Sequence, residues 1–114
     1  MINKIILTGR LVRDPELHET EDGVKFSTFT LAVDRNFKNR EGEVETDFID
    51  VITWRGQAER CSEYLSKGRL TGVEGSLRIN KTKKEDKTYI NPQINADRVE
   101  FLDWGNSEKQ KVGT

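Results

Sequence analysis

Apolar residues alternate with polar ones along most of this chain, a pattern that predicts β-strands. Residues 4–13 are rich in Ile, Leu and Val and end at Asp14-Pro15, which predicts a first strand followed by a turn. Residues 24–34 alternate next, but the apolar positions change parity within this run. A change of parity inside a strand predicts a β-bulge, and small barrels need such bends in order to close.

A third strand is predicted over residues 48–54, after a polar segment at 36–45 that predicts a long hairpin loop. Its side chains should divide between two faces, because neighbouring residues of a strand point to opposite sides. One face carries Phe48, Asp50, Ile52 and Trp54, and the other carries Ile49, Val51 and Thr53.

One helix is predicted over residues 57–67, where apolar residues recur at helical spacing. The apolar stripe of this helix consists of Ala58, Cys61, Tyr64 and Leu65. Gly68 follows the last turn, and a glycine there predicts that the helix ends in a left-handed C′ residue.

Two further strands are predicted at residues 73–79 and 89–102, joined by a charged hairpin tip at 81–87. Five strands are therefore predicted, with the helix between the third and the fourth. This order predicts an all-β protein with an OB-fold, a five-stranded Greek-key barrel that often binds oligonucleotides. An SH3-like barrel would lack the helix at that point.

Three irregularities are expected in the last two strands. Gly72 and Gly75 fit a tight bend or a close backbone approach, and Pro92 should lie at an edge or a bulge because it has no N–H to donate. The apolar positions change parity again between Ala96 and Val99, which predicts a second bulge.

The length and composition fit one soluble domain. The chain has 114 residues, of which 33% are apolar and 34% charged, and we expect a barrel over residues 1–104 and a flexible tail over 105–114. No apolar run approaches the roughly 18 residues of a membrane span. Charge and glycine also come too early in the chain for a signal peptide. We therefore expect a cytosolic protein without a membrane partner.

Charges are partly sorted along the chain, although the net charge is only −1. Acids gather at residues 16–22 and 41–47, and bases gather at 35–40 and 78–87. Binding to phosphates depends on the local charge that meets them, so a net charge near zero does not exclude a nucleic-acid partner. Either basic run could alternatively be an ordinary solvated surface.

Patterns for catalysis or metal binding are missing from the sequence. It contains no HExxH motif, no pair of cysteines, no nucleophile elbow and no phosphate-binding P-loop, so we expect neither an enzyme nor a bound cofactor or metal. His18 is the only histidine, and beside Glu16 and Glu19 it should be a solvated turn residue. Cys61 is the only cysteine, and its place in the helix favours a small buried apolar residue over a reactive thiol.

Several segments, in order and at matching spacing, resemble the bacterial single-stranded DNA-binding proteins. The likeness covers roughly residues 1–102. The segments that carry it are Ile2 to Leu11, Asp14-Pro15-Glu16-Leu17, Thr28 to Val33, Ala58-Glu59, Tyr64-Leu65, Lys67-Gly68 and Gly72 to Arg78.

The resemblance implies an OB-fold homotetramer that binds single-stranded DNA without reading its sequence. It implies a role in protecting exposed strands during replication, recombination and repair. The family's stacking aromatics fall on Phe37, Phe48 and Trp54. These rings could instead belong to the core or to a subunit contact. Phe37 has little apolar surface around it in the sequence and is the stronger candidate for an exposed ring.

Phosphate contacts are expected from basic residues along the same surface. The candidates are Lys4, Arg10, Arg35, Lys38, Arg55, Lys67, Arg78, Lys81 and Lys83. Arg35, Lys38, Arg78 and Lys81 are favoured because they flank the aromatic loop or lead into the last hairpin. Strand one is apolar on both faces around Ile5-Ile6-Leu7, so one of its sides could meet another subunit.

The chain departs from the family pattern around the predicted interface. Thr82 stands where an aromatic is usual, which removes one stacking ring unless Tyr89 partly replaces it. Asp50 and Gly56 stand where neutral or basic residues are common, and both should weaken phosphate binding. Asn91-Pro92-Gln93 interrupts a stretch that is normally a regular apolar strand.

The last residues depart from the family pattern as well. Typical members end in an acidic tip that recruits replication and repair proteins, whereas this sequence ends in residues 108–114, which are not acidic. We therefore expect either a short paralogue, such as one from a phage or mobile element, or a trimmed chain, and carry over no partner of that tip.

Two other functions fit the same fold. One is an OB-fold protein–protein adaptor of the primosome type, which would not need Phe37, Phe48 and Trp54 to be accessible. The other is RNA binding, because stacking grooves accept both nucleic acids.

Overall fold

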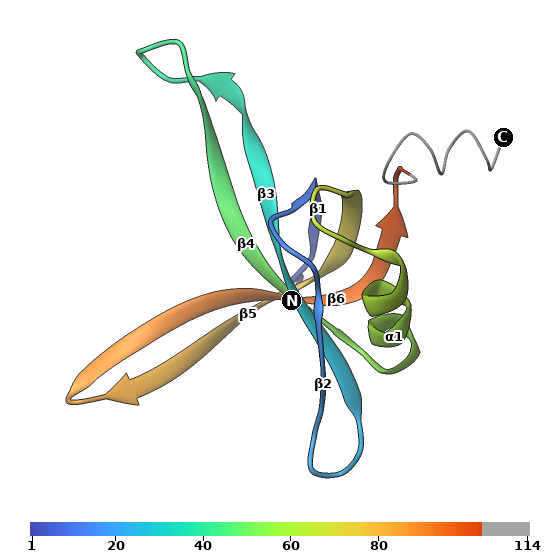
Figure 1. Ribbon diagram of the computed structural model, residues 1–114. Helices are drawn as coiled ribbons and strands as arrows, with labels where there is room; N and C mark the ends of the chain where they lie inside the picture. The colour runs from blue at the N-terminus through green and yellow to red at the C-terminus, as the bar shows by residue number, and fades with distance from the viewer. Residues whose placement is uncertain (104–114) are drawn as a thin grey trace, which may run out of the picture.

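The computed structural model describes residues 1–103, which form six β-strands and one α-helix (Figure 1). In chain order the elements are β1 (Ile5–Leu11), β2 (Glu16–Glu19), β3 (Lys25–Lys38), β4 (Val44–Trp54), α1 (Arg55–Tyr64), β5 (Leu70–Lys84) and β6 (Lys87–Phe101). The proposed tail at residues 105–114 and Trp104 lie outside the described residues.

Five of the strands close into a barrel. The sheet runs in the order β1-β5-β6-β4-β3-β2, and β1 also pairs with β3, which closes the ring. All these pairings are antiparallel except that of β4 with β6, which is parallel. The predicted OB-fold, with its helix between the third and fourth barrel strands, is confirmed.

The core fills the inside of this barrel and is closed at one end by α1. Leu31, Val51 and Ile94 are among its fully buried side chains, and Ala58 and Cys61 reach it from the helix. Cys61 is completely buried, so the prediction that it serves as a small apolar residue is confirmed. Burial raises the pKa of its thiol to about 11.

The first predicted bulge is wrong in position. The register of β3 with β4 is unbroken from Phe26 to Asp34, and the shift comes later, between Asp34 and Lys38. The small polar Ser27 occupies the buried position that an apolar residue would normally take. Phe26 consequently lies on the outer face of the sheet. The change of parity at Phe26 therefore reflects an apolar residue on that face and not a bulge.

The second predicted bulge is confirmed. Glu74 pairs with Arg98 while Gly75 pairs with Ala96, so Asp97 is an extra residue on β6. At this point the two backbones come so close that a Cβ on Gly75 would collide with the Asn95 carbonyl oxygen. The close approach expected of Gly75 is therefore present.

The helix lies two to three residues earlier than predicted. It ends at Tyr64, and Leu65 is already extended with φ −93° and ψ 148°. Gly68 is therefore not the C′ residue of the helix. It lies in the following turn with φ +89° and donates its N–H to the Leu11 carbonyl at 2.8 Å.

Two long hairpins extend beyond the barrel, as Figure 1 shows. We call the ends of β3 and β4 (residues 34–48) the first arm and the ends of β5 and β6 (residues 77–92) the second arm. Most residues of the two segments predicted as loops belong to strands. β3 extends to Lys38, β4 already begins at Val44, and β5 extends to Lys84. The radius of gyration of 16.0 Å exceeds the ~13 Å of a compact domain of about 100 residues. Pro92 lies in the second arm, just before β6 joins β4, which agrees with its predicted edge position.

Candidate nucleic-acid interface

The outer face of β4 carries two of the predicted stacking rings. Val51 and Thr53 are buried inside the barrel, and alternation therefore turns Phe48 and Trp54 outward. Phe48 is 67% exposed and Trp54 is 38% exposed. The two-faced division predicted for this strand is confirmed, and neither ring belongs to the core.

Trp54 is held in a fixed orientation by its neighbours. Its indole Nε1 donates a hydrogen bond to Asn95 Oδ1 on β6 at 2.9 Å. On its other side lies the ring of Phe26, with the two centroids 5.3 Å apart. One face of the indole is thereby supported while the residue stays partly exposed, as a stacking platform requires.

The other aromatic rings of the interface lie on the two arms. Phe37 is 66% exposed near the end of the first arm. Thr82, at the position of the missing aromatic, pairs directly with Tyr89 on the second arm. Directly paired residues share a face of the sheet, so Tyr89, which is 48% exposed, places a ring beside the vacant position.

A row of polar residues crosses the outer face between the rings. Arg78 on β5 pairs with Gln93 on β6, Gln93 with Asp50 on β4, and Asp50 with Thr30 on β3. The hydroxyl of Thr30 donates to the Asp50 carboxylate at 2.8 Å. Asp50 therefore places a negative charge between Phe48 and Trp54, while Arg78 brings a positive charge to the same face.

Three of the predicted phosphate-binding cations are already engaged with acids. Lys4 lies 3.0 Å from Glu74, and Arg10 lies 3.2 Å from Asp103. Arg10 also donates to the Gly68 carbonyl at 2.9 Å. Lys4 precedes β1 and Glu74 lies on β5, whereas Arg10 lies on β1 and Asp103 follows β6.

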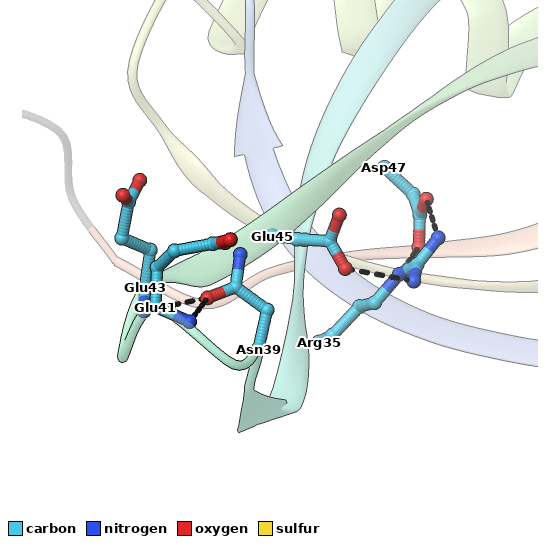
Figure 2. A network of polar contacts seen from close by, with 6 residues as sticks. All are labelled: Arg35, Asn39, Glu41, Glu43, Glu45 and Asp47. Carbon is cyan, nitrogen blue, oxygen red and sulfur yellow. Dashed lines mark hydrogen bonds and ion pairs between the residues drawn. The ribbon is translucent and has the colours of Figure 1, made fainter.

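Arg35 is the third engaged cation, and it is held by two carboxylates on β4 (Figure 2). Its Nε and Nη2 each donate to Asp47 at 3.1 Å, and its Nη1 donates to Glu45 at 3.2 Å. The hydrogen bonds and charge of Asp47 raise the pKa of Arg35, and Arg35 lowers the pKa of the Asp47 carboxyl. A phosphate must compete with both acids for this guanidinium.

Asn39 organises the tip of the first arm (Figure 2). Its side-chain oxygen accepts hydrogen bonds from the backbone N–H groups of Glu41 and Glu43, each at 3.0 Å. The backbone N–H of Asn39 donates to the Glu43 carbonyl at 2.8 Å. The loop that carries Glu41 and Glu43 is therefore compact, and it follows Phe37 closely in the chain.

The remaining six predicted cations form no ion pair with any residue in the part of the chain that the structure describes. They are Lys38, Arg55, Lys67, Arg78, Lys81 and Lys83. Lys81 and Lys83 alternate with Thr82 along β5 and so lie on the opposite face of the second arm from Arg78. Lys67 lies in the turn after α1, where its N–H donates to Asp14, and is not part of the outer face.

Arg55 lies at a strained corner of the backbone. It follows Trp54 directly and begins α1 with φ +59°, a left-handed conformation that favours glycine. The corner turns the chain from the outer strand into the helix. Its side chain is exposed, directly after Trp54 at the end of β4.

Sequence reasoning missed four contributors to this surface, namely His18, Phe26, Asn95 and Arg13. His18 is exposed, as predicted, but it lies in strand β2 and not in a turn, and it is stacked on Phe26 with 5.1 Å between ring centroids. Arg13 lines a cavity of about 200 Å³ on the outer face together with Asp50 and Gln93. One sequence feature could have placed Phe26 on this face, namely its position in the alternation of apolar and polar residues along the strand.

Two classes of site are not found in the described residues. No group of three or more His, Cys, Asp or Glu side chains within residues 1–103 is placed to hold a metal ion. No helix in the same residues is long and apolar enough to cross a membrane.

Known proteins resemble this chain along most of its length. The model of the Single-strand binding protein family matches residues 2–102. The chain is 47% identical over 111 residues to Single-stranded DNA-binding protein 2 of Staphylococcus aureus strain COL, covering 96% of this chain and 80% of the relative. It is 43% identical over 116 residues to the Single-stranded DNA-binding protein of Bacillus cereus, covering 100% of this chain and 68% of the relative.

A solved structure is also similar. The crystal structure of a deletion mutant of the single-stranded DNA binding protein from Thermus aquaticus superimposes with a TM-score of 0.69 at 34% identity. The matched part covers 88% of this chain but only 40% of the Thermus chain. The similarity in sequence and in structure thus extends over the whole barrel.

Proposed function

Because the chain belongs to the single-strand binding protein family, we propose that it binds single-stranded DNA without reading the base sequence. Bases stack on Phe37, Phe48 and Trp54, and phosphates meet the cations beside them. The function is binding and not catalysis. Its biological role is to hold and protect exposed strands during replication, recombination and repair.

The observation that carries this proposal is the outward orientation of Phe48 and Trp54 on β4. A partly exposed indole that is fixed by Asn95 and supported by Phe26 is suited to an aromatic ligand. Stacking is tolerant of sequence because every base has a π-face, and each stack contributes about 1–3 kcal/mol. The accessibility of all three rings favours strand binding over the adaptor function.

The proposed phosphate contacts fall into two groups. Arg78, Arg55 and Lys38 form no ion pair with a described residue and lie close to the aromatic rings, and Lys81 and Lys83 add positive charge on the other face of the second arm. Lys4, Arg10 and Arg35 must exchange a carboxylate for a phosphate. Lys67 is the weakest member of the set because it lies beside Asp14, away from the outer face.

We also propose that the chain assembles as a homotetramer through β1. Between Ile5 and Gly9 this strand pairs only with β5 among residues 1–103, which leaves its other edge unpaired in the described part of the chain. Ile6 on the outer side is 70% exposed and lines a cleft of about 480 Å³ together with Leu102. An open edge beside apolar surface is a site where a second copy can add its own strand. We propose that the protein acts in the bacterial cytosol or nucleoid, which is supported by the bacterial origin of its relatives.

Titration with oligo-dT tests the binding proposal. We expect tryptophan fluorescence to fall on binding and the affinity to drop steeply as salt rises. Trp104→Phe provides the background in which Trp54 is the only indole. Unchanged fluorescence, with no retardation of oligo-dT at low salt, would contradict the proposal.

Substitutions locate the stacking surface. Trp54→Ala and Phe37→Ala should each weaken binding while the melting temperature stays close to that of the parent. Tyr64→Ala is the matched control, because Tyr64 is an exposed aromatic on α1 that contacts Phe101 and lies off the outer face. The same titrations with oligo-rU show whether RNA binds equally well.

A further inference from the structure

Three aromatic rings lie in a row across β2, β3 and β4. His18 on β2 is stacked on Phe26 on β3, with a centroid separation of 5.1 Å and an interplanar angle of 30°. Phe26 in turn lies against Trp54 on β4, with a separation of 5.3 Å and an angle of 37°. We call these three residues the ring ladder.

The strand register fixes this ladder. His18 pairs directly with Phe26, and Phe26 pairs directly with Trp54. Directly opposite residues of antiparallel strands point to the same face, so all three rings share the outer face that carries the proposed interface. Their separations are close to the ~4.8 Å spacing of neighbouring strands. The ladder is therefore a consequence of sheet pairing and does not depend on one flexible side chain.

The two ends of the ladder differ. At one end the indole of Trp54 is tied to Asn95, and in the middle Phe26 is only partly exposed between its neighbours. At the other end His18 is exposed, on a strand that lies outside the barrel. The imidazole is consequently supported on one face by Phe26 and accessible at the end of the row.

We infer that His18 is an additional base-stacking residue, by which β2 extends the DNA surface beyond the barrel. The inference rests on the proposed binding of single-stranded DNA and adds a ring to a surface that lacks one at Thr82. A phosphate is the less suitable ligand here, because Glu16 lies on the same face of β2 and Glu19 follows His18. A stacked base brings no charge to these carboxylates.

The single histidine allows a direct test by NMR. Imidazole Hε1 and Hδ2 resonances of the folded chain belong to His18 without further assignment. On adding oligo-dT to the full chain we expect these protons to move upfield by ring-current shielding and to show NOEs to thymine H6 and methyl protons. If tryptophan fluorescence reports binding while the His18 resonances stay unchanged, His18 does not stack. If neither responds, single-strand binding itself fails, and the inference fails with it.

Variants separate stacking from phosphate contact and from indirect effects on Trp54. His18→Ala should weaken binding to oligo-dT about fivefold or more, with an unchanged slope of log affinity against log salt, and His18→Phe should restore the affinity. A smaller salt slope in His18→Ala would identify a phosphate contact instead. Leu17→Ala, on the same strand but on its other face, is the control and should bind as the parent does. If the emission spectrum of the free His18→Ala protein shifts in the Trp104→Phe background, His18 acts by positioning Trp54, which also overturns the inference.

Discussion

Asp50 is an acid at the centre of the outer face, where its charge opposes DNA. It lies between Phe48 and Trp54 along β4 and accepts a hydrogen bond from Thr30. Asp50→Asn keeps an oxygen that can accept this bond and removes the charge. We expect oligo-dT to bind about two- to fivefold more tightly at low salt, the range of surface charge interactions of up to ~1 kcal/mol.

Titrations at low and high salt check this prediction, since the gain should shrink as salt screens the charge. Asp22→Asn is the control, because it removes an exposed acid from the turn between β2 and β3 and leaves the outer face intact. If both variants gain the same affinity for oligo-dT, the effect comes from the net charge of the protein and not from the position of Asp50.

Arg55 combines a cation with an unfavourable backbone conformation. Its φ of +59° is in the left-handed region, which costs an ordinary residue roughly 1–2 kcal/mol, whereas glycine adopts it freely but loses about 0.5–1 kcal/mol of chain entropy. Arg55→Gly should therefore unfold at higher denaturant than Arg55→Ala, by about 0.5–1 kcal/mol in the free energy of unfolding. Both variants should lose the same part of the salt slope, because both lose the cation. Equal stability of the two would show that the corner is not strained.

Cys61 gives a pH-dependent contribution to stability. Burial raises the pKa of its thiol from 9.0 to about 11, so the fold favours the neutral thiol over the thiolate. This contribution is complete below pH 9 and is lost as the pH rises through about 11. At pH 8 we expect a thiol reagent such as DTNB to react slowly with the folded chain and fast in denaturant. Fast reaction of the folded chain would mean that the helix opens readily.

At the scale of elements, the first arm contains a cation, Arg35, whose guanidinium is bound by carboxylates of the same arm and is therefore not free to bind a phosphate. Glu45 and Asp47 bind Arg35, so replacing both by Gln and Asn should free the guanidinium for a phosphate. One additional phosphate contact steepens the slope of log affinity against log salt by about 0.7 for single strands. We therefore expect Glu45→Gln with Asp47→Asn to tighten binding and to steepen the salt dependence.

The same arm offers a matched control for this double variant. Glu41→Gln with Glu43→Gln removes two carboxylates from the adjacent loop, where Asn39 bonds to backbone groups of both residues and Arg35 pairs with Glu45 and Asp47 instead. The change in net charge is identical. If the control steepens the salt slope as much as the double variant does, the release of Arg35 is not the cause.

The barrel strands were predictable because their apolar residues face one core. Alternation around Val51 defined β4, and the parity change near Ala96 located a true bulge. β2 was missed because all four of its residues are exposed, so no alternation marks it. The arms were mistaken for loops for a related reason, since their two-stranded ribbons have no buried face.

The sequence predicted the orientation of the stacking rings better than the ion pairs of the cations. Alternation alone turned Phe48 and Trp54 outward, but no local pattern showed that Arg35 lies beside Asp47 across a hairpin. The supporting contacts of Trp54 come from Phe26 and Asn95 on other strands. These contacts depend on which residues of neighbouring strands pair with each other. That pairing cannot be derived from the sequence when the position of a bulge is predicted incorrectly.

At the scale of the whole molecule, the charges explain how a chain of net charge −1 can bind DNA. Carboxylates neutralise Lys4 and Arg10 at β1 and Arg35 on the first arm. Among the described residues, most of the predicted phosphate-binding cations that form no ion pair lie near the rings or along the second arm, and Lys67 is the exception. Electrostatic attraction is therefore local, and the stacking rings must supply a large share of the affinity.

The open edge of β1 predicts how copies of the chain associate. Ile6→Glu places a charge on the exposed apolar position beside this edge, and burying a charge without a partner is strongly unfavourable. Ile6 points away from the core, so the barrel should fold as before. We expect the parent chain to have a mass four times 13.1 kDa by light scattering on a sizing column, and the variant to have a smaller mass at the same concentration. Leu17→Glu, which charges an exposed apolar residue on β2, is the control and should stay tetrameric. A parent chain that elutes as a monomer, or an Ile6→Glu variant of unchanged mass, would contradict assembly through this edge.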